Sequence, residues 1–231
     1  MRFLPQIIIA LTIAFSAFLI GKGLEHFNRD ERIISVRGLA EKEVEANIAV
    51  WKITFNVSSD KIDDVRTQLP AAQGNIQDFL IKAGFDLKEI SKDSNIRDRQ
   101  AQEYGEGKGN RFVATGIYTI KTAQVKKVEE AVQSLDELLR KGVVITASTK
   151  SFYFTNLNEI KPAMLDEATK NAKEAAEGFA KSMNVNVGKL KSASQGVFTI
   201  ENAIGNGGYS EGDSSIDKKI RVVTQVDFYI N

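Results

Sequence analysis

Ala49-Val50-Trp51-Lys52-Ile53-Thr54-Phe55-Asn56-Val57 is the stretch of the chain that indicates its fold most directly. All of its odd-numbered side chains are apolar, whereas three of its four even-numbered side chains are polar. Because successive side chains of a β-strand point to opposite faces, this period of two predicts a strand with one buried face. A strand of this kind is typical of an antiparallel sheet that is covered on one side.

Three segments farther along the chain carry the spacing of amphipathic helices, in which apolar residues recur every three or four positions. The first helix is expected to end at Gly84, the second to cover residues 125–142, and the third to begin near Pro162. Their apolar stripes are Ile62, Val65, Leu69, Ala72, Ile76, Phe79 and Ala83; Val125, Val128, Val132, Leu135 and Leu139; and Leu165, Ala168, Ala172, Ala175, Phe179 and Met183.

The remaining regular segments have the composition of strands. Together with residues 49–57, they are expected at residues 33–44, 90–102, 112–120, 143–154, 187–200 and 220–230. The resulting order is ββαββαβαββ, in which most neighbouring strands are joined by hairpins. This order predicts an α+β domain, with a mainly antiparallel sheet and three helices packed on it.

The N-terminus has no charged side chain from Phe3 to Gly21, and most of its residues there are apolar. Nineteen helical residues span about 28 Å, close to the roughly 30 Å of a bilayer core. We therefore expect residues 1–23 to form a transmembrane anchor or a signal segment, residues 24–32 a juxtamembrane linker, and residues 33–231 the folded domain. An uncleaved anchor is favoured because Lys22 interrupts the small residues that a signal peptidase would need, and because the run is longer than the apolar region of a typical signal peptide.

The composition argues against several classes of function. The 31 basic and 30 acidic residues leave a net charge of +1, which gives no electrostatic reason to expect nucleic acid as a partner. The absence of cysteine excludes disulfides and thiolate chemistry. The single imidazole, His26, lies in the expected linker, where a solvated role is favoured over catalysis. We therefore expect no catalytic residue, no cofactor and no metal ion.

A Gly-rich loop at residues 202–215 is the most distinctive irregular segment. Its glycines and small polar residues predict a mobile connection between two strands. Ile204 and Tyr209 are apolar residues in this polar loop, and they are the candidate contacts for a partner or a neighbouring subunit.

Two segments carry a family resemblance. Residues 36–47, which run into the strand at 49–57, and the Ala-rich third helix with its exit Met183-Asn184-Val185-Asn186-Val187-Gly188-Lys189-Leu190 resemble the SIMPL domain, also called DUF541. The sequence departs from that family at Ala46-Asn47, where Pro-Asp is usual, and at Asn184, where the family has glycine. The resemblance extends over residues 33–231. It implies a bacterial exported or envelope protein, a role in envelope stress tolerance and assembly into hollow homo-oligomers, and it supplies no catalytic residues.

Together these observations predict a non-enzymatic, membrane-anchored envelope protein whose domain self-assembles into a ring or cage. The expected location is the bacterial inner membrane, with the domain on the periplasmic or extracytoplasmic side, or the periplasm if the segment is cleaved. The alternative is a binding module for a small ligand or an envelope component, gated by the loop at residues 202–215. The sequence does not identify that ligand.

Overall fold

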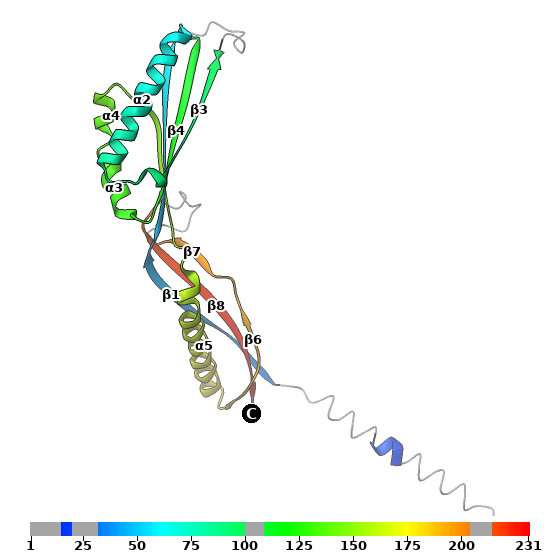
Figure 1. The fold of residues 1–231 in the computed structure, drawn as a ribbon. Helices are drawn as coiled ribbons and strands as arrows, with labels where there is room; N and C mark the ends of the chain where they lie inside the picture. Colours follow the sequence, from blue (N-terminus) through cyan, green and yellow to red (C-terminus); the bar gives the residue numbers. More distant parts are fainter. Residues whose placement is uncertain (1–14, 20–31, 100–108, 204–213) are drawn as a thin grey trace, which may run out of the picture. The chain divides into compact units, whose positions relative to one another are not determined.

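The computed structural model describes residues 15–19, 32–99, 109–203 and 214–231 (Figure 1). The predicted membrane segment at residues 1–23 lies outside this part, apart from the helical residues 15–19, and so does the linker, apart from Arg32. Within the described residues, no helix has the length and apolarity that crossing a bilayer requires.

The described part is a mixed α+β fold, as predicted, although its elements are more finely divided. In chain order they are β1 (Ile33–Glu45), β2 (Ile48–Ser59), α2 (Ile62–Lys82), the 3₁₀ turn η1 (Leu87–Glu89), β3 (Ile90–Asp98), β4 (Phe112–Thr122), α3 (Val125–Gln133), α4 (Asp136–Arg140), β5 (Val144–Tyr153), α5 (Leu157–Ser182), β6 (Val187–Gln195), β7 (Thr199–Asn202) and β8 (Asp217–Ile230).

The strands form two sheets, not the single sheet that was predicted. Sheet I has the order β3-β4-β2-β5, and sheet II has the order β1-β8-β6, with β7 also paired to β8. The division occurs at Ala46 and Asn47, because the Ala46 N–H donates to the Ile216 carbonyl and the next N–H, of Asn47, donates to the Tyr153 carbonyl. β1 and β2 therefore join different sheets and do not form a hairpin.

By compactness the chain divides into two units. Unit 1 comprises residues 1–38, 169–195 and 224–231, and unit 2 comprises residues 39–168 and 196–223. Sheet I lies wholly in unit 2, whereas β1, α5 and β8 contribute residues to both units.

The main core of unit 2 lies between sheet I and the helices α2, α3 and α4, which cover one face of the sheet (Figure 1). The alternation predicted for residues 49–57 is confirmed, because all five odd-numbered side chains are buried. The first helix is also confirmed, with a buried stripe from Val65 to Phe79 and its end at Gly84, whose φ of +86° suits glycine, although Ile62 at the predicted start of the stripe is exposed. The core of unit 2 thus holds sheet I in one register and leaves the opposite face of the sheet open.

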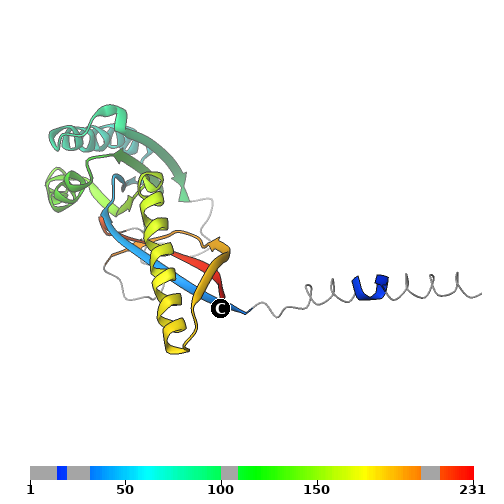
Figure 2. The ribbon, with the colours of Figure 1, turned by 90° about the horizontal axis from the view of Figure 1, so that it is seen from below.

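The third predicted helix, α5, lies along sheet II (Figure 2), and most of the helix residues buried there are alanines. In unit 1, Ala172 and Ala176 contact β1 and β8 residues, and in unit 2, Met164 and Ala168 do the same. The predicted stripe is wrong at its C-terminal end, since Phe179 and Met183 are 55% and 60% exposed. The buried row runs at a constant spacing of four from Met164 to Ala180, and the alanines at its last four positions let the helix lie close to the strands.

Two predicted elements are interrupted. The helix expected at residues 125–142 changes direction at Ser134 and Leu135, whose N–H groups donate to carbonyls three residues back, so Leu138 is buried in place of Leu139. The strand expected at residues 187–200 breaks at Gly196, where a Cβ atom would lie 2.6 Å from the Val223 carbonyl oxygen.

Candidate functional site

The outer edge of sheet I is formed by β3 (Figure 1). This strand pairs with β4 on one side, in a continuous register from Ile90 opposite Ile120 to Asp98 opposite Phe112. Every residue of β3 except Ile90 is exposed, and the strand contains neither proline nor glycine. It therefore presents a straight row of backbone N–H and C=O groups, on which another strand can form a ladder of hydrogen bonds.

Two other edge strands, β5 of sheet I and β6 of sheet II, are less suited to pairing. The register between β2 and β5 shifts at Thr54 and Phe55, and the register between β6 and β8 shifts twice, around Leu190. Such irregularities bend and twist a strand, and they are a common means of blocking edge-to-edge association. Of these three edges, β3 offers the most regular template.

The face of sheet I that the helices leave uncovered is polar. Lys52, Thr54 and Asn56 of β2 and Thr115, Ile117 and Thr119 of β4 lie on it, together with Ser91, Asp93, Asn95 and Arg97 of β3. The Asn56 Oδ1 atom is buried there and has no hydrogen-bond partner among the described residues. This arrangement of amides, hydroxyls and charged side chains suits binding to another polar surface better than it suits covalent chemistry.

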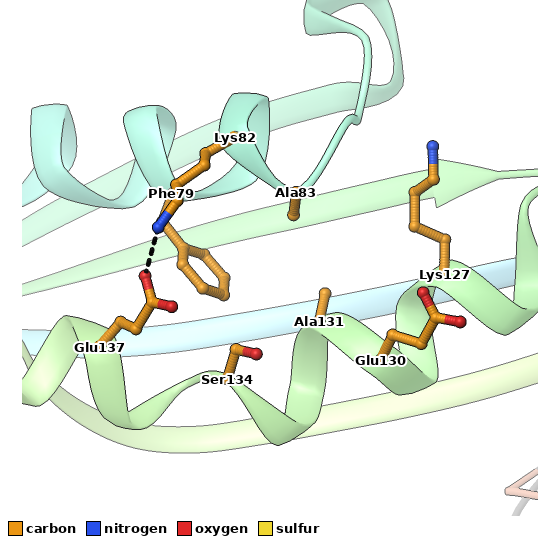
Figure 3. A pocket seen from close by; sticks show the side chains of 8 residues that line it. All are labelled: Phe79, Lys82, Ala83, Lys127, Glu130, Ala131, Ser134 and Glu137. Carbon is orange, nitrogen blue, oxygen red and sulfur yellow. Dashed lines mark hydrogen bonds and ion pairs between the residues drawn. The ribbon is translucent and has the colours of Figure 1, made fainter.

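A small pocket lies between the C-terminal end of α2 and the helices α3 and α4 (Figure 3). Its volume is about 230 Å³, below the roughly 300–1,000 Å³ of most ligand sites. Across it, Lys82 Nζ lies 3.1 Å from Glu137 Oε2, and Lys127 Nζ donates to the Gly84 carbonyl at 3.1 Å. Both lysines already bind groups of the protein. These contacts connect α2 and the residues that follow it to α3 and α4, and they leave little charge for a ligand.

In unit 1, a carboxylate holds three strands of sheet II together. Ser35 Oγ of β1 and Ser192 Oγ of β6 donate to the two oxygens of Asp227 on β8, at 2.6 and 2.5 Å. These hydroxyls, with that of Ser192 contributing most, lower the pKa of Asp227 below its ordinary value of 3.8. A serine nucleophile needs a base with a pKa near neutrality, so a carboxylate with a lowered pKa does not activate it.

The lowered pKa gives this cluster a pH dependence. Because Asp227 binds its proton less tightly in the folded state, its contribution to stability is present above the unfolded pKa and is lost as the pH falls through the folded pKa. We expect Asp227→Asn to be less stable than the wild type at pH 7, and this difference to shrink on acidification below pH 3.8. Thermal unfolding at a series of pH values measures it, with Asp166→Asn on the exposed side of α5 as the control. An equal loss at every pH would contradict this role.

The residues singled out from the sequence lie largely outside the described part of the chain. Ile204, Tyr209 and His26 are among the undescribed residues, as is most of the loop at 202–215. At the described end of that loop, Asn202 Oδ1 accepts a hydrogen bond of 2.7 Å from Lys218 Nζ, and Lys218 is almost fully buried. Where the structure is described, no group of three or more His, Cys, Asp or Glu side chains could hold a metal ion.

The β3 edge was missed by sequence reasoning. Residues 90–102 were predicted as a polar strand, but the prediction did not say whether the strand lies at the edge or in the middle of a sheet. The available signal was the arrangement of charges in Lys92-Asp93 and Arg97-Asp98, since a strand with so many charged residues is poorly suited to a central position.

One family model matches most of the chain. This family is described as SIMPL, a protein of unknown function (DUF541), and the match covers residues 34–227. No curated protein sequence matches the chain. The matched range begins in β1 and ends in β8, so it includes residues of both units and of both sheets.

Proposed function

The chain belongs to the SIMPL (DUF541) family, and we propose that it is a non-enzymatic bacterial envelope protein whose N-terminal apolar segment anchors a self-assembling domain at the membrane. The observation that carries this proposal is the open edge of β3, which has a continuous register and eight exposed residues of nine. A long, regular and unblocked edge strand is the kind of surface on which a second chain adds its own strand. A ring or cage needs a further contact surface as well, since one twofold contact closes after two copies.

The anchoring part of the proposal is supported by the composition of unit 1. The start of β1 lies beside the C-terminus, because the Ile230 N–H donates to the Arg32 carbonyl and the Asn186 N–H donates to that of Asn231. This unit exposes large apolar side chains and lysines together, as proteins at the surface of an anionic bilayer do. The exposed residues are Ile33, Phe179, Met183, Leu190, Arg32, Lys181, Lys189 and Lys191.

We expect the full-length chain to float with phosphatidylcholine–phosphatidylglycerol vesicles, and to leave mild detergent as a particle with more than one copy. Membrane association should be lost in the double variant Ile9→Arg/Ile13→Arg, because each arginine costs about 2.5–3.5 kcal/mol at the centre of a membrane helix. Vesicle flotation and native mass spectrometry measure the two properties separately.

The matched control is Ile9→Leu/Ile13→Leu, which keeps the segment apolar and should float like the wild type. Arginine variants that float equally well would overturn the anchor. A strict monomer at micromolar concentration, with the anchor present, would overturn self-assembly and favour the alternative of a binding module gated by residues 202–215.

A further inference from the structure

We propose that β3 pairs antiparallel with β3 of a second copy, with the two Asn95 residues opposite each other on a twofold axis. This inference rests on the proposed self-assembly and adds to it the surface, the orientation and the register. The partner is therefore a second copy of this chain, recognised by backbone hydrogen bonds along the strand and by oppositely charged side chains that face each other.

Geometry limits the registers that are available. Two identical strands related by a twofold axis perpendicular to the sheet must place residues of the same face opposite each other. The axis then passes midway between the two copies of one residue, and moving this centre by one residue changes every opposed pair. The choice of register can therefore be made from the side chains of β3 alone.

The charges of β3 select the register centred on Asn95. In this register Asp93 lies opposite the Arg97 of the second copy, and the twofold axis repeats this ion pair on the other side. Oppositely charged residues that face each other across strands stabilise the pairing. If the centre moves to Ser94, Asp93 faces Asn95 and Arg97 faces Ser91, so both ion pairs are lost. If it moves to Ile96, Arg97 faces Asn95, and Asp93 faces Arg99, which lies beyond the last residue of β3. Only the register centred on Asn95 forms both ion pairs between residues inside the strand.

Asp93 and Arg97 are available for this role. They are four residues apart on one extended strand, about 13 Å, so they do not pair within one chain. Both side chains are exposed on the open face of sheet I, where Asp93 Oδ1 accepts a hydrogen bond only from the neighbouring Ser94 N–H among the described contacts.

A second charged pair, Lys92 opposite Asp98, fits the same register. Asp98 is already bound within its own chain by the Arg111 guanidinium, at 2.8 Å. The register therefore depends on Asp93 and Arg97, and the pair of Lys92 and Asp98 is consistent with it.

Pairing in this way extends sheet I to eight strands in the order β5-β2-β4-β3-β3-β4-β2-β5, with the helices of both copies on one face. The strands at the two new ends are both β5, where the register shift at Thr54 and Phe55 makes the edge irregular. A bulged edge resists further strand addition, so the pairing closes at two copies.

Charge reversal tests the register directly. In detergent-solubilised full-length protein, Asp93→Arg and Arg97→Asp should each raise the dissociation constant of the pair by about tenfold or more, because each change turns two attractive pairs into repulsive ones. The double variant Asp93→Arg/Arg97→Asp should associate like the wild type. An equimolar mixture of the two single variants should form a 1:1 complex, since each then supplies the charge that the other lacks. Asp166→Arg, the same reversal on α5, should change nothing.

Cross-linking gives a second measurement. Because the chain has no cysteine, Asn95→Cys introduces a single thiol at the axis, where opposed Cα atoms lie about 4.5–5.5 Å apart and can form a disulfide. Mild oxidation should convert this variant to a covalent dimer. Ser91→Cys on the same face should remain uncross-linked, since the two copies of residue 91 would be about 27 Å apart.

The possible failures are distinguishable. A wild type that never associates would overturn both the proposed self-assembly and the register. A wild type that associates while both single charge variants associate equally well, or while Ser91→Cys cross-links as readily as Asn95→Cys, would overturn the register alone. Far-ultraviolet circular dichroism of each variant confirms that the fold is kept.

Discussion

Replacing Trp51 with alanine is expected to lower the free energy of unfolding by about 3–5 kcal/mol, the range for removing a large aromatic side chain from a core. The Trp51 indole is fully buried at the centre of sheet I. Its ring lies edge-on to Phe79 of α2, with centroids 6.5 Å apart, and contacts Phe85 at 6.2 Å. Alanine would leave a cavity between β2 and the end of α2 that these neighbours cannot fill without moving.

The measurement is thermal unfolding by calorimetry, in which the transition of unit 2 should fall by roughly 10 °C or more. Trp51→Phe is the control, because it keeps an aromatic ring and loses mainly the 2.9 Å hydrogen bond from Nε1 to Ser148 Oγ, worth about 1 kcal/mol. If alanine and phenylalanine lowered the transition equally, the hydrogen bond and not the packing would be the main contribution of Trp51.

Gly116→Ala is the second substitution with a large expected effect, although it adds only one methyl group. Gly116 of β4 lies directly opposite Phe55 of β2, and a Cβ atom at this glycine would lie 2.2 Å from two atoms of the Phe55 ring. The ring is fully buried and covers the glycine, so neither side has room to move. We expect a loss of about 1–3 kcal/mol, as for other overpacked cores.

Whether Gly116→Ala stabilises or destabilises the fold depends on the Phe55 ring. In a Phe55→Ala background the space above residue 116 is empty, so Gly116→Ala should be neutral or stabilising there, and a double-mutant cycle measures the difference. Gly74→Ala is the matched control, because no atom lies within 4 Å of its Cβ position in α2, and helix propensity predicts a gain of about 1 kcal/mol. A Gly116→Ala that was destabilising to the same extent with and without Phe55 would contradict this account.

Both substitutions bear on the proposed interface. Ser94 of β3 lies opposite Gly116 on the other side of β4, so the core beneath β4 supports the edge strand. A variant of Gly116 that weakens the fold should weaken pairing as well, whereas the charge variants of β3 should change pairing without changing the unfolding temperature of the dissociated monomer. Measuring both properties for each variant separates loss of the interface from loss of the fold.

The sequence predicted those features that depend on local pattern. Residues 49–57 alternate because one face of β2 contacts the helices, and Gly84 and Gly142 end helices because each has a positive φ. The buried face of α5 was only half predicted. The predicted row and the buried row share Ala168 and Ala172 and differ after that point. The prediction chose Phe179 and Met183 because they are large and apolar, whereas the close approach of α5 to sheet II buries Ala176 and Ala180.

Features that depend on partners distant in the sequence could not be predicted. Whether β1 continues into a hairpin with β2 is decided at Ala46 and Asn47 by hydrogen bonds to residues 216 and 153, far along the chain. The position of β3 at an edge has the same origin. The charges of β3 disfavour a central position, but its place at the edge follows from the absence of any strand beyond it among the described residues.

The way the two units share the chain also limits how the protein can be dissected. Unit 1 is assembled from three separate stretches and unit 2 from two, with the boundaries inside β1, α5 and β8. No single proteolytic cut releases either unit as a continuous fragment, and a truncation at any of these boundaries divides a strand or a helix. The folded region should therefore be inherited, expressed and exchanged between proteins as one block, and shortened versions that keep only one unit should accumulate as insoluble chains.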